Sequence, residues 1–352
     1  MTLPTEPIGS IPRPATLLDG MKAHAAGKLS AEALERLYDD AVADTVRRFE
    51  ETGSPVITDG EQRKPSFATY PIAGLTDLSP DGVVIPFADG HTRQLPRLTR
   101  APFRYARFAA PDVELAARVA RRPLKVAVIS ASALSLLYPP EGIAGYSREA
   151  FLDDLVRDAQ EDLRKALAVA HSVQIDFTEG RLSLKLDPTG DLLRSFVELI
   201  NRVIAPFDAD RARLGVHTCP GGDQDSTHSA DVDYAALLPT LFSLDVGKFF
   251  VQLASEKDRP RVLQILGGLS RPDRRIFVGV IDPLDRRVET AGEVRDRILE
   301  AARFIEPSRL GTCDDCGFSP FGDDVSTSRD VAFAKIRARV EGNELASREL
   351  GV

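Results

Sequence analysis

Residues Ser147–Gly180, SREAFLDDLVRDAQEDLRKALAVAHSVQIDFTEG, contain the unit from which the fold is built. Up to His171, apolar side chains recur every three or four residues, as they do along one face of an amphipathic helix. A short apolar run then begins at Val173 and ends in the polar sequence DFTEG. A helix, a buried strand and a polar strand end together indicate an α/β protein with a parallel sheet.

The same kind of apolar run recurs along the chain. Six further runs are Val56–Gly60, Lys125–Ser130, Leu214–Cys219, Lys248–Ala254, Ile276–Asp282 and Arg309–Cys316, and an eighth candidate is the N-terminal EPIGSIP. Eight such runs, most of them followed by helical patterns, predict a (β/α)8 TIM barrel that forms one domain over residues 1–352. A doubly wound open sheet is the alternative, but the number and even spacing of the runs favour closure.

One stretch interrupts this alternation. Residues about 70–110 include GVVIPFADGHTRQLPRLTR, which alternates in polarity on both sides of the turn sequence DG. Such a pattern is typical of a β-hairpin. We therefore expect an antiparallel β-hairpin inserted into the barrel rather than a separate domain.

The composition excludes several classes of protein. The chain has 352 residues, of which 43% are hydrophobic, and a net charge of -8. An acidic chain lacks the basic surface that nucleic acid binding requires. No apolar run reaches the roughly 18 to 20 residues that span a bilayer, so no membrane association is expected. Three cysteines make no disulfide framework, which favours a cytoplasmic location.

Two predicted strands end in potential metal ligands. His217 and Cys219 close one strand, and Cys313 and Cys316 close another about a hundred residues later. Strand ends of a barrel face one cavity, so His217, Cys219 and one of the later cysteines can form a nitrogen and sulfur set suited to Zn²⁺. A redox dithiol, a Cys219 nucleophile with His217 as its base, and inert buried cysteines are the alternatives.

Six motifs together resemble the C-terminal catalytic barrel of the cobalamin-independent methionine synthases. They are EPIGSIPRP, ITDGEQR, VQIDFTEG, GVHTCPGGD, VGVIDPLDRRVET and TCDDCGFSP, in the same order over nearly the whole chain. The resemblance implies a short, single-barrel, zinc-dependent methyltransferase that converts homocysteine to methionine. The methyl donor is either methyltetrahydrofolate or another compound such as a corrinoid, and the partners are then the thiol, the donor and a possible methyl-carrier protein.

The resemblance also assigns roles to individual residues. It implies that His217, Cys219 and Cys316 bind the zinc ion, whereas Cys313 has no counterpart. The family often adds a glutamate from the sixth strand, and Glu256 is the candidate here, although the register places Gln252 or Leu253 nearer that position.

A second group matches the family's residues around the amino-acid thiol. Its members are Ile8, Gly9, Ser10, Glu61 and Asp176. The two carboxylates suit the ammonium group of an amino acid, and Ser10 with nearby N–H groups suits its carboxylate.

The half of the site that receives the methyl donor departs from the family. Leu284 occupies the place of the family's histidine after the seventh strand, so Asp282 and His228 are candidates for the proton donor. The chain also has no Trp to stack on a pterin. A thiol alkylation like that of the epoxyalkane–coenzyme M transferases is one alternative function. A non-catalytic or partner-dependent metal-binding module is the other.

Overall fold

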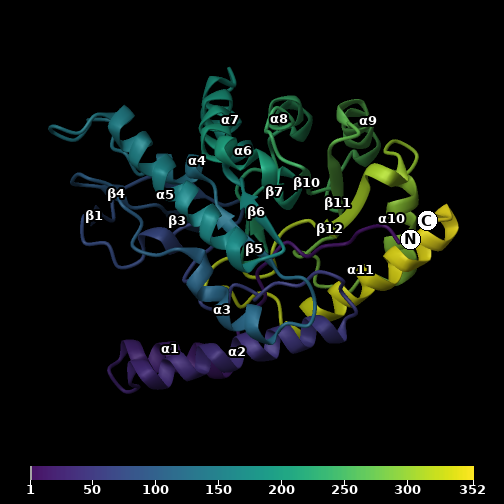
Figure 1. The fold of residues 1–352 in the computed structure, drawn as a ribbon, viewed down its shortest axis with the longest axis horizontal. Coiled ribbons are helices and arrows are strands. Elements are labelled where there is room, and N and C mark those ends of the chain that lie inside the picture. The colour runs from purple at the N-terminus through teal and green to yellow at the C-terminus, as the bar shows by residue number, and fades with distance from the viewer. Residues whose placement is uncertain (1) are drawn as a thin grey trace.

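The computed structural model describes residues 2–352, and its centre is a parallel sheet of six strands (Figure 1). The strand order is β12-β11-β10-β7-β6-β5, so neighbours in the sheet are consecutive along the chain except where the antiparallel pair β8 (Gly222–Asp223) and β9 (Ser226–Thr227) intervenes between β7 and β10. The strands are β5 (Lys125–Ile129), β6 (Ser172–Asp176), β7 (Leu214–Thr218), β10 (Lys248–Val251), β11 (Arg275–Ile281) and β12 (Leu310–Asp314). The predicted α/β class with a central parallel sheet is confirmed.

The first two predicted strands are extended segments at the two edges of this sheet. Thr5 forms a single parallel bridge with Thr312 of β12, and Ile57 forms one with Leu124, just before β5. The two segments also meet, because Thr58 Oγ1 donates a hydrogen bond of 2.8 Å to the carbonyl oxygen of Gly9. The regular strand pairing therefore comprises six strands rather than eight. Prolines at positions 4, 7, 12 and 55 explain the difference, since proline cannot donate to a strand ladder.

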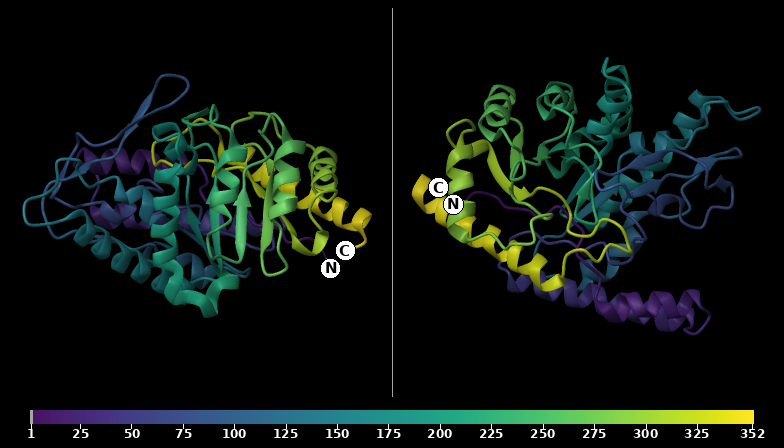
Figure 2. Two further views of the ribbon diagram at one scale, coloured as in Figure 1. Left: turned by 90° about the horizontal axis from the view of Figure 1, so that it is seen from above. Right: turned by 180° about the vertical axis from the view of Figure 1, so that it is seen from behind.

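Helices surround the sheet (Figures 1 and 2). Between and beyond the strands they are α1 (Ala15–Ala25), α2 (Ala31–Glu51), α3 (Ala109–Val119), α4 (Ala131–Ser135), α5 (Arg148–Val169), α6 (Glu179–Leu186), α7 (Asp191–Ile204), α8 (Tyr234–Leu241), α9 (Arg259–Leu269), α10 (Ala291–Ala301) and α11 (Arg329–Leu350). Several begin at a serine whose hydroxyl accepts a backbone N–H, as Ser147 does for α5. Within residues 2–352, no helix combines the length and the apolar character needed to cross a membrane.

The stretch between α2 and α3 contains two short antiparallel pairs. Strand β2 (Val84–Pro86) pairs with β3 (Thr92–Gln94), and β1 (Leu78–Ser79) pairs with β4 (Arg97–Leu98). The turn between β2 and β3 contains Gly90, whose positive φ of 95° is the reason that the DG sequence turns there. This β2–β3 hairpin reaches the polar end of the central sheet, where the backbone N–H of Ala88 donates to the carbonyl oxygen of Thr227 at 2.9 Å.

Candidate metal centre and substrate cavity

Three predicted ligands meet at the polar end of the sheet. His217 is the fourth residue of β7, Cys219 follows that strand directly, and Cys316 lies two residues beyond β12. One ligand atom from each residue lies within 4.8 Å of the others. Parallel strands bring their carboxyl ends to one edge, which is why residues so far apart in the sequence converge.

The chemistry of this group fits a zinc ion. Both ring nitrogens of His217 are buried, and neither has a hydrogen-bond partner among residues 2–352. Such a buried, unpaired imidazole is costly unless something else binds it. Hydrogen bonding to Cys219, followed by burial, raises the pKa of the Cys316 thiol well above its usual value, and a bound cation would reverse this effect. One nitrogen and two sulfurs are ligands that Zn²⁺ accepts.

Asp315 holds the loop that carries Cys316. Its carboxylate accepts hydrogen bonds of 2.8 Å from the backbone N–H groups of Leu253, Ala254 and Ser255. Gly279 leaves room for this carboxylate, because a Cβ at that position would lie 1.8 Å from Asp315 Oδ1. The end of β12 is thereby tied to the chain after β10, and this role was not assigned from the sequence.

Cys313 and Glu256 lie outside the three-residue group. Cys313 belongs to a separate apolar cluster with Phe250 and Phe277, and its Sγ lies 3.5 Å from the carbonyl oxygen of Phe277. Glu256 forms an ion pair with the buried Arg181, and the group of convergent ligands in the described chain does not include it. Gln252 donates through Nε2 to Ser255 Oγ at 2.7 Å, and its buried Oε1 has no partner among residues 2–352.

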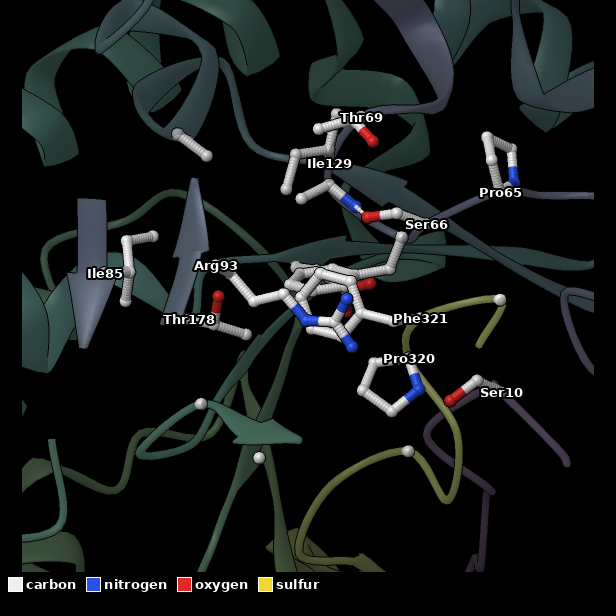
Figure 3. A pocket seen from close by; sticks show the side chains of 18 of the residues that line it. Ser10, Pro65, Ser66, Thr69, Ile85, Arg93, Ile129, Thr178, Pro320 and Phe321 are labelled. Atoms are coloured by element: carbon white, nitrogen blue, oxygen red, sulfur yellow. Dashed lines mark hydrogen bonds between the residues drawn. The ribbon is translucent and has the colours of Figure 1, made fainter. Parts of the chain in front are cut away.

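A cavity of about 550 Å³ adjoins the three-residue group. Figure 3 shows part of its wall, including Ser10. Of the residues predicted from the sequence, it is lined by Ile8, Ser10, Glu61, Asp176, His217, His228 and Cys316. Cys219 is fully buried beside the cavity. Gly9 packs closely against Glu61, since a Cβ on Gly9 would lie only 2.6 Å from Glu61 Oε1. The structure thus brings the predicted metal ligands and the predicted amino-acid site together.

Two buried carboxyl groups line the side of the cavity formed by β6 and the chain after Ile57. Burial raises the pKa of Glu61 to about 7, although Lys64 Nζ lies 3.6 Å from Glu61 Oε2 and opposes the rise. Burial also raises the pKa of Asp176, and the side-chain amide of Gln174 donates to Asp176 Oδ1 at 2.7 Å. Glu61 Oε2 is buried and has no hydrogen-bond partner in the described chain, so it is available to a ligand.

Ser10 joins the N-terminal segment to the loop after Cys316. Its Oγ accepts a hydrogen bond of 3.2 Å from the backbone N–H of Ser319, and its carbonyl oxygen accepts one of 3.0 Å from Phe318. Gly317 permits this approach, since a Cβ there would lie 2.1 Å from Ser10 Oγ. The hydroxyl proton of Ser10 is left to donate to a ligand in the cavity.

The two candidate proton donors occupy different places. His228 lines the large cavity, with Nδ1 2.7 Å from Ser229 Oγ, and burial lowers its pKa to about 4, so the ring is neutral at pH 7. Asp282 does not line that cavity. It borders a smaller one together with Leu284 and Cys316, and its Oδ1 accepts the backbone N–H of Leu284 at 3.0 Å.

The β2–β3 hairpin supplies residues that were not predicted for the site. Arg93 extends from β3 into the cavity and lies over the ring of Phe321, 4.2 Å from its centroid (Figure 3). Its guanidinium also binds the fully buried carboxylate of Asp223 and that of Asp323. No local pattern marks these contacts, because they join segments more than a hundred residues apart.

Glu179 is another lining residue that the sequence did not assign. It occurs in the DFTEG motif, where only Asp176 received a role, and its side chain is buried in the cavity wall. The signal in the sequence that could have identified Glu179 was an acidic residue three positions after a predicted strand end.

Comparison with known proteins supports the resemblance. No family model matches the chain. The methionine synthase of Sulfolobus acidocaldarius is 26% identical over 349 residues, which cover 99% of this chain and 93% of the relative. The methionine synthase of Sulfurisphaera tokodaii is 26% identical over 352 residues, which cover 99% of this chain and 94% of the relative.

Solved structures with similar folds carry related names. A B12-independent methionine synthase from Shewanella sp. W3-18-1, in complex with selenomethionine, superposes with a TM-score of 0.76 at 20% identity and 99% coverage of both chains. A putative vitamin-B12 independent methionine synthase from Listeria monocytogenes gives a TM-score of 0.69 at 24% identity, with 98% and 99% coverage. The resemblance drawn from the six motifs is confirmed: over nearly its whole length, this chain is similar to proteins named methionine synthase.

Proposed function

We propose that the protein transfers a methyl group to the thiol of homocysteine and so forms methionine, with Zn²⁺ held by His217, Cys219 and Cys316. One observation carries the proposal: His217 and Cys316 line the cavity that also contains the carboxyl groups of Glu61 and Asp176, and Cys219 is grouped with these two ligands behind its wall. A thiol-binding metal and an ammonium-binding pair of carboxylates together suit an amino acid that bears a thiol.

The metal and the cavity have separate tasks. His217, Cys219 and Cys316 would hold the Zn²⁺ ion, which would favour the thiolate form of the substrate at neutral pH, where a free thiol with a pKa near 8.5 is mostly protonated. Glu61 and Asp176 orient the ammonium group through charge-assisted hydrogen bonds. Ser10 donates its hydroxyl proton to the substrate carboxylate. The buried walls exclude water, which strengthens these contacts.

We also infer that the two edge segments complete an eight-stranded barrel, so that residues 1–352 form one barrel domain with an insertion at about 70–110. The single bridges of Thr5 and Ile57, and the hydrogen bond between their segments, support this closure. A cytoplasmic location is part of the same proposal, because the free sulfurs of Cys219 and Cys316, 2.7 Å apart, need a reducing compartment to stay unbridged.

The charge of the cavity separates this function from thiol alkylation of the coenzyme M type. A thiol that carries a sulfonate would face the carboxyl groups of Glu61 and Asp176. Like charges in a buried site repel each other strongly. Homocysteine avoids this repulsion because its ammonium group is placed toward the carboxylates.

The direct test is methyl transfer by the purified, zinc-loaded protein. Homocysteine is supplied with methyltetrahydrofolate, methylcobalamin or S-methylmethionine, one donor at a time, and methionine is measured. We expect methionine from at least one donor, and none from the zinc-free protein. Coenzyme M in place of homocysteine serves as the control. Methylation of coenzyme M but not of homocysteine would contradict the proposal.

A further inference from the structure

Glu179 is a buried acid that none of the roles above uses. It is the first residue of α6, three positions after Asp176, and its side chain lines the cavity that contains His217 and Cys316. Only 4% of its surface is exposed. It therefore faces the same cavity as the proposed amino-acid site, from the start of the helix that follows Asp176.

The two oxygens of this carboxyl group are in different situations. The hydroxyl groups of Ser130 and Ser132 both donate to Oε1, the second at 2.5 Å. Oε2 is also buried, but it has no hydrogen-bond partner among residues 2–352. Buried polar atoms are normally paired. The serines thus fix the group through one oxygen and leave the other for a ligand.

Other potential proton donors near the cavity are less suitable. Asp282 does not line it, and Leu284 has no proton to give. Asp323 lines the cavity, but both of its oxygens accept hydrogen bonds from Arg93. His228 lines it as a neutral ring at pH 7. Glu61 and Asp176 are assigned to the substrate ammonium, which leaves Glu179.

We propose that Glu179 donates the proton that the leaving nitrogen of an N-methyl donor requires, and this inference rests on the proposed function. The substrate thiolate sulfur forms a bond to the methyl carbon, while the bond between that carbon and the donor nitrogen breaks. The electron pair of the broken bond stays on the nitrogen, which takes the proton from Glu179 Oε2. The carboxyl group becomes a carboxylate, and the two serine hydroxyls stabilise it through Oε1.

The protonation state of Glu179 agrees with this role. Burial raises its pKa to about 7, against the opposing effect of the two serine hydroxyls, so a large fraction carries the proton at neutral pH. A general acid works best when its pKa lies near the working pH. The other charged and titratable side chains that line the cavity are Lys22, Glu61, Arg93, Asp176, His217, His228, Cys316 and Asp323.

The test compares donors whose leaving groups differ in their need for a proton. Methyltetrahydrofolate loses its methyl group from a nitrogen atom that must then be protonated. The demethylated products of methylcobalamin and S-methylmethionine leave without taking up a proton. We expect Glu179→Gln to lower kcat with methyltetrahydrofolate by about 100-fold or more, because general acids contribute roughly 10²- to 10⁴-fold. The decline of the wild-type rate above about pH 7 should disappear in the variant. Zinc content and methionine affinity should not change.

Ser132→Ala provides a second test that keeps the acid in place. Loss of a hydrogen bond to the carboxylate should raise the pKa of Glu179, so the descending limb of the pH profile should move to higher pH. Ser135→Ala is the matched control, because Ser135 also lies buried on α4 but donates to the carbonyl oxygen of Ser132 instead of to Glu179. Its pH profile should equal that of the wild type.

Two results would overturn the inference while leaving the proposed function intact. One is a wild-type rate with methyltetrahydrofolate in Glu179→Gln. The other is methylation of homocysteine by the wild type from methylcobalamin or S-methylmethionine but not from methyltetrahydrofolate. Absence of methionine with all three donors would instead contradict the proposed function, and the inference would fall with it.

Discussion

The sulfur atoms of Cys219 and Cys316 lie 2.7 Å apart, although 97 residues separate them along the chain. Both cysteines are free, and His217 shares their position at the end of the sheet. Two sulfur atoms this close suit a shared metal site, where both thiols would release their protons and bind the same cation as His217. The pair is therefore the clearest structural sign of a metal centre in the described residues.

Zinc binding should depend on Cys316 and not on Cys313. We expect about one zinc ion per chain in the wild type and loss of that zinc in Cys316→Ser. Cys313→Ser is the control, because Cys313 packs among Ile8, Phe250 and Phe277 away from the group. Glu256→Gln should also keep the zinc, since Glu256 pairs with Arg181. Metal analysis of the purified wild type and variants measures the zinc content of each. Equal zinc content in Cys316→Ser and the wild type would contradict the assignment of Cys316 as a ligand.

The affinity for the amino-acid product should depend on pH through Glu61. The pKa of Glu61 is raised to about 7 by burial, and only the ionised carboxylate attracts an ammonium group. Affinity for methionine should therefore rise as the pH increases through 7. Glu61→Gln should weaken binding about 10- to 100-fold, as expected for a lost charge-assisted hydrogen bond, and remove this pH dependence. Calorimetric titration with methionine, which has no thiol to titrate, tests both. A wild-type affinity that stays constant from pH 6 to about 8 would disprove the role.

Gly221 and its neighbour Gly222 should differ sharply in their tolerance of a methyl group. Gly221 has a φ of 72°, and a Cβ there would lie 1.7 Å from His228 Nε2, whereas a Cβ on Gly222 has no neighbour closer than 3.7 Å. Gly221→Ala should lower stability by about 1–3 kcal/mol and weaken zinc binding, because its N–H contacts Cys219 Sγ at 3.4 Å. Gly222→Ala should resemble the wild type. Thermal unfolding measures the stability of each variant, and competition with a chelator measures its affinity for zinc. Equal effects of the two substitutions would contradict the expected difference.

Arg93 should control the opening of the β2–β3 hairpin. It is the permanently charged partner of the fully buried carboxylate of Asp223, whose other side-chain contact is His91 Nε2 at 3.1 Å, so Arg93→Ala should cost the closed hairpin roughly 3–5 kcal/mol. The hairpin should open instead, and amide hydrogen exchange over residues 84–94 should become faster. Arg97→Ala is the control in the same insertion, because the acidic partners of Arg97 are exposed. Unchanged exchange in Arg93→Ala would show that other contacts hold the hairpin.

The regular part of the fold was predictable because its signals are local. The helix over Arg148–Val169 and the strand Ser172–Asp176 follow from spacing and β-branched content within Ser147–Gly180. The two edge segments were predicted as full strands, yet each forms one bridge with the sheet. Their prolines limit the ladder, and how far a segment pairs depends on its neighbour rather than on its own apolar pattern.

The sequence alone determined which chemical groups the site contains, because ligand types and strand ends are local properties. It offered His217, Cys219 and one of Cys313 or Cys316 as metal ligands, and the resemblance to the methionine synthases implied roles for the carboxyl groups of Glu61 and Asp176. Only the tertiary structure decided which sulfur joins the ligand group and which carboxyl groups share a cavity. Cys313 turns into the apolar cluster, Glu256 meets Arg181, and Glu179 is held by two serines with one oxygen left unpaired. These outcomes depend on packing between distant segments, which no local pattern encodes.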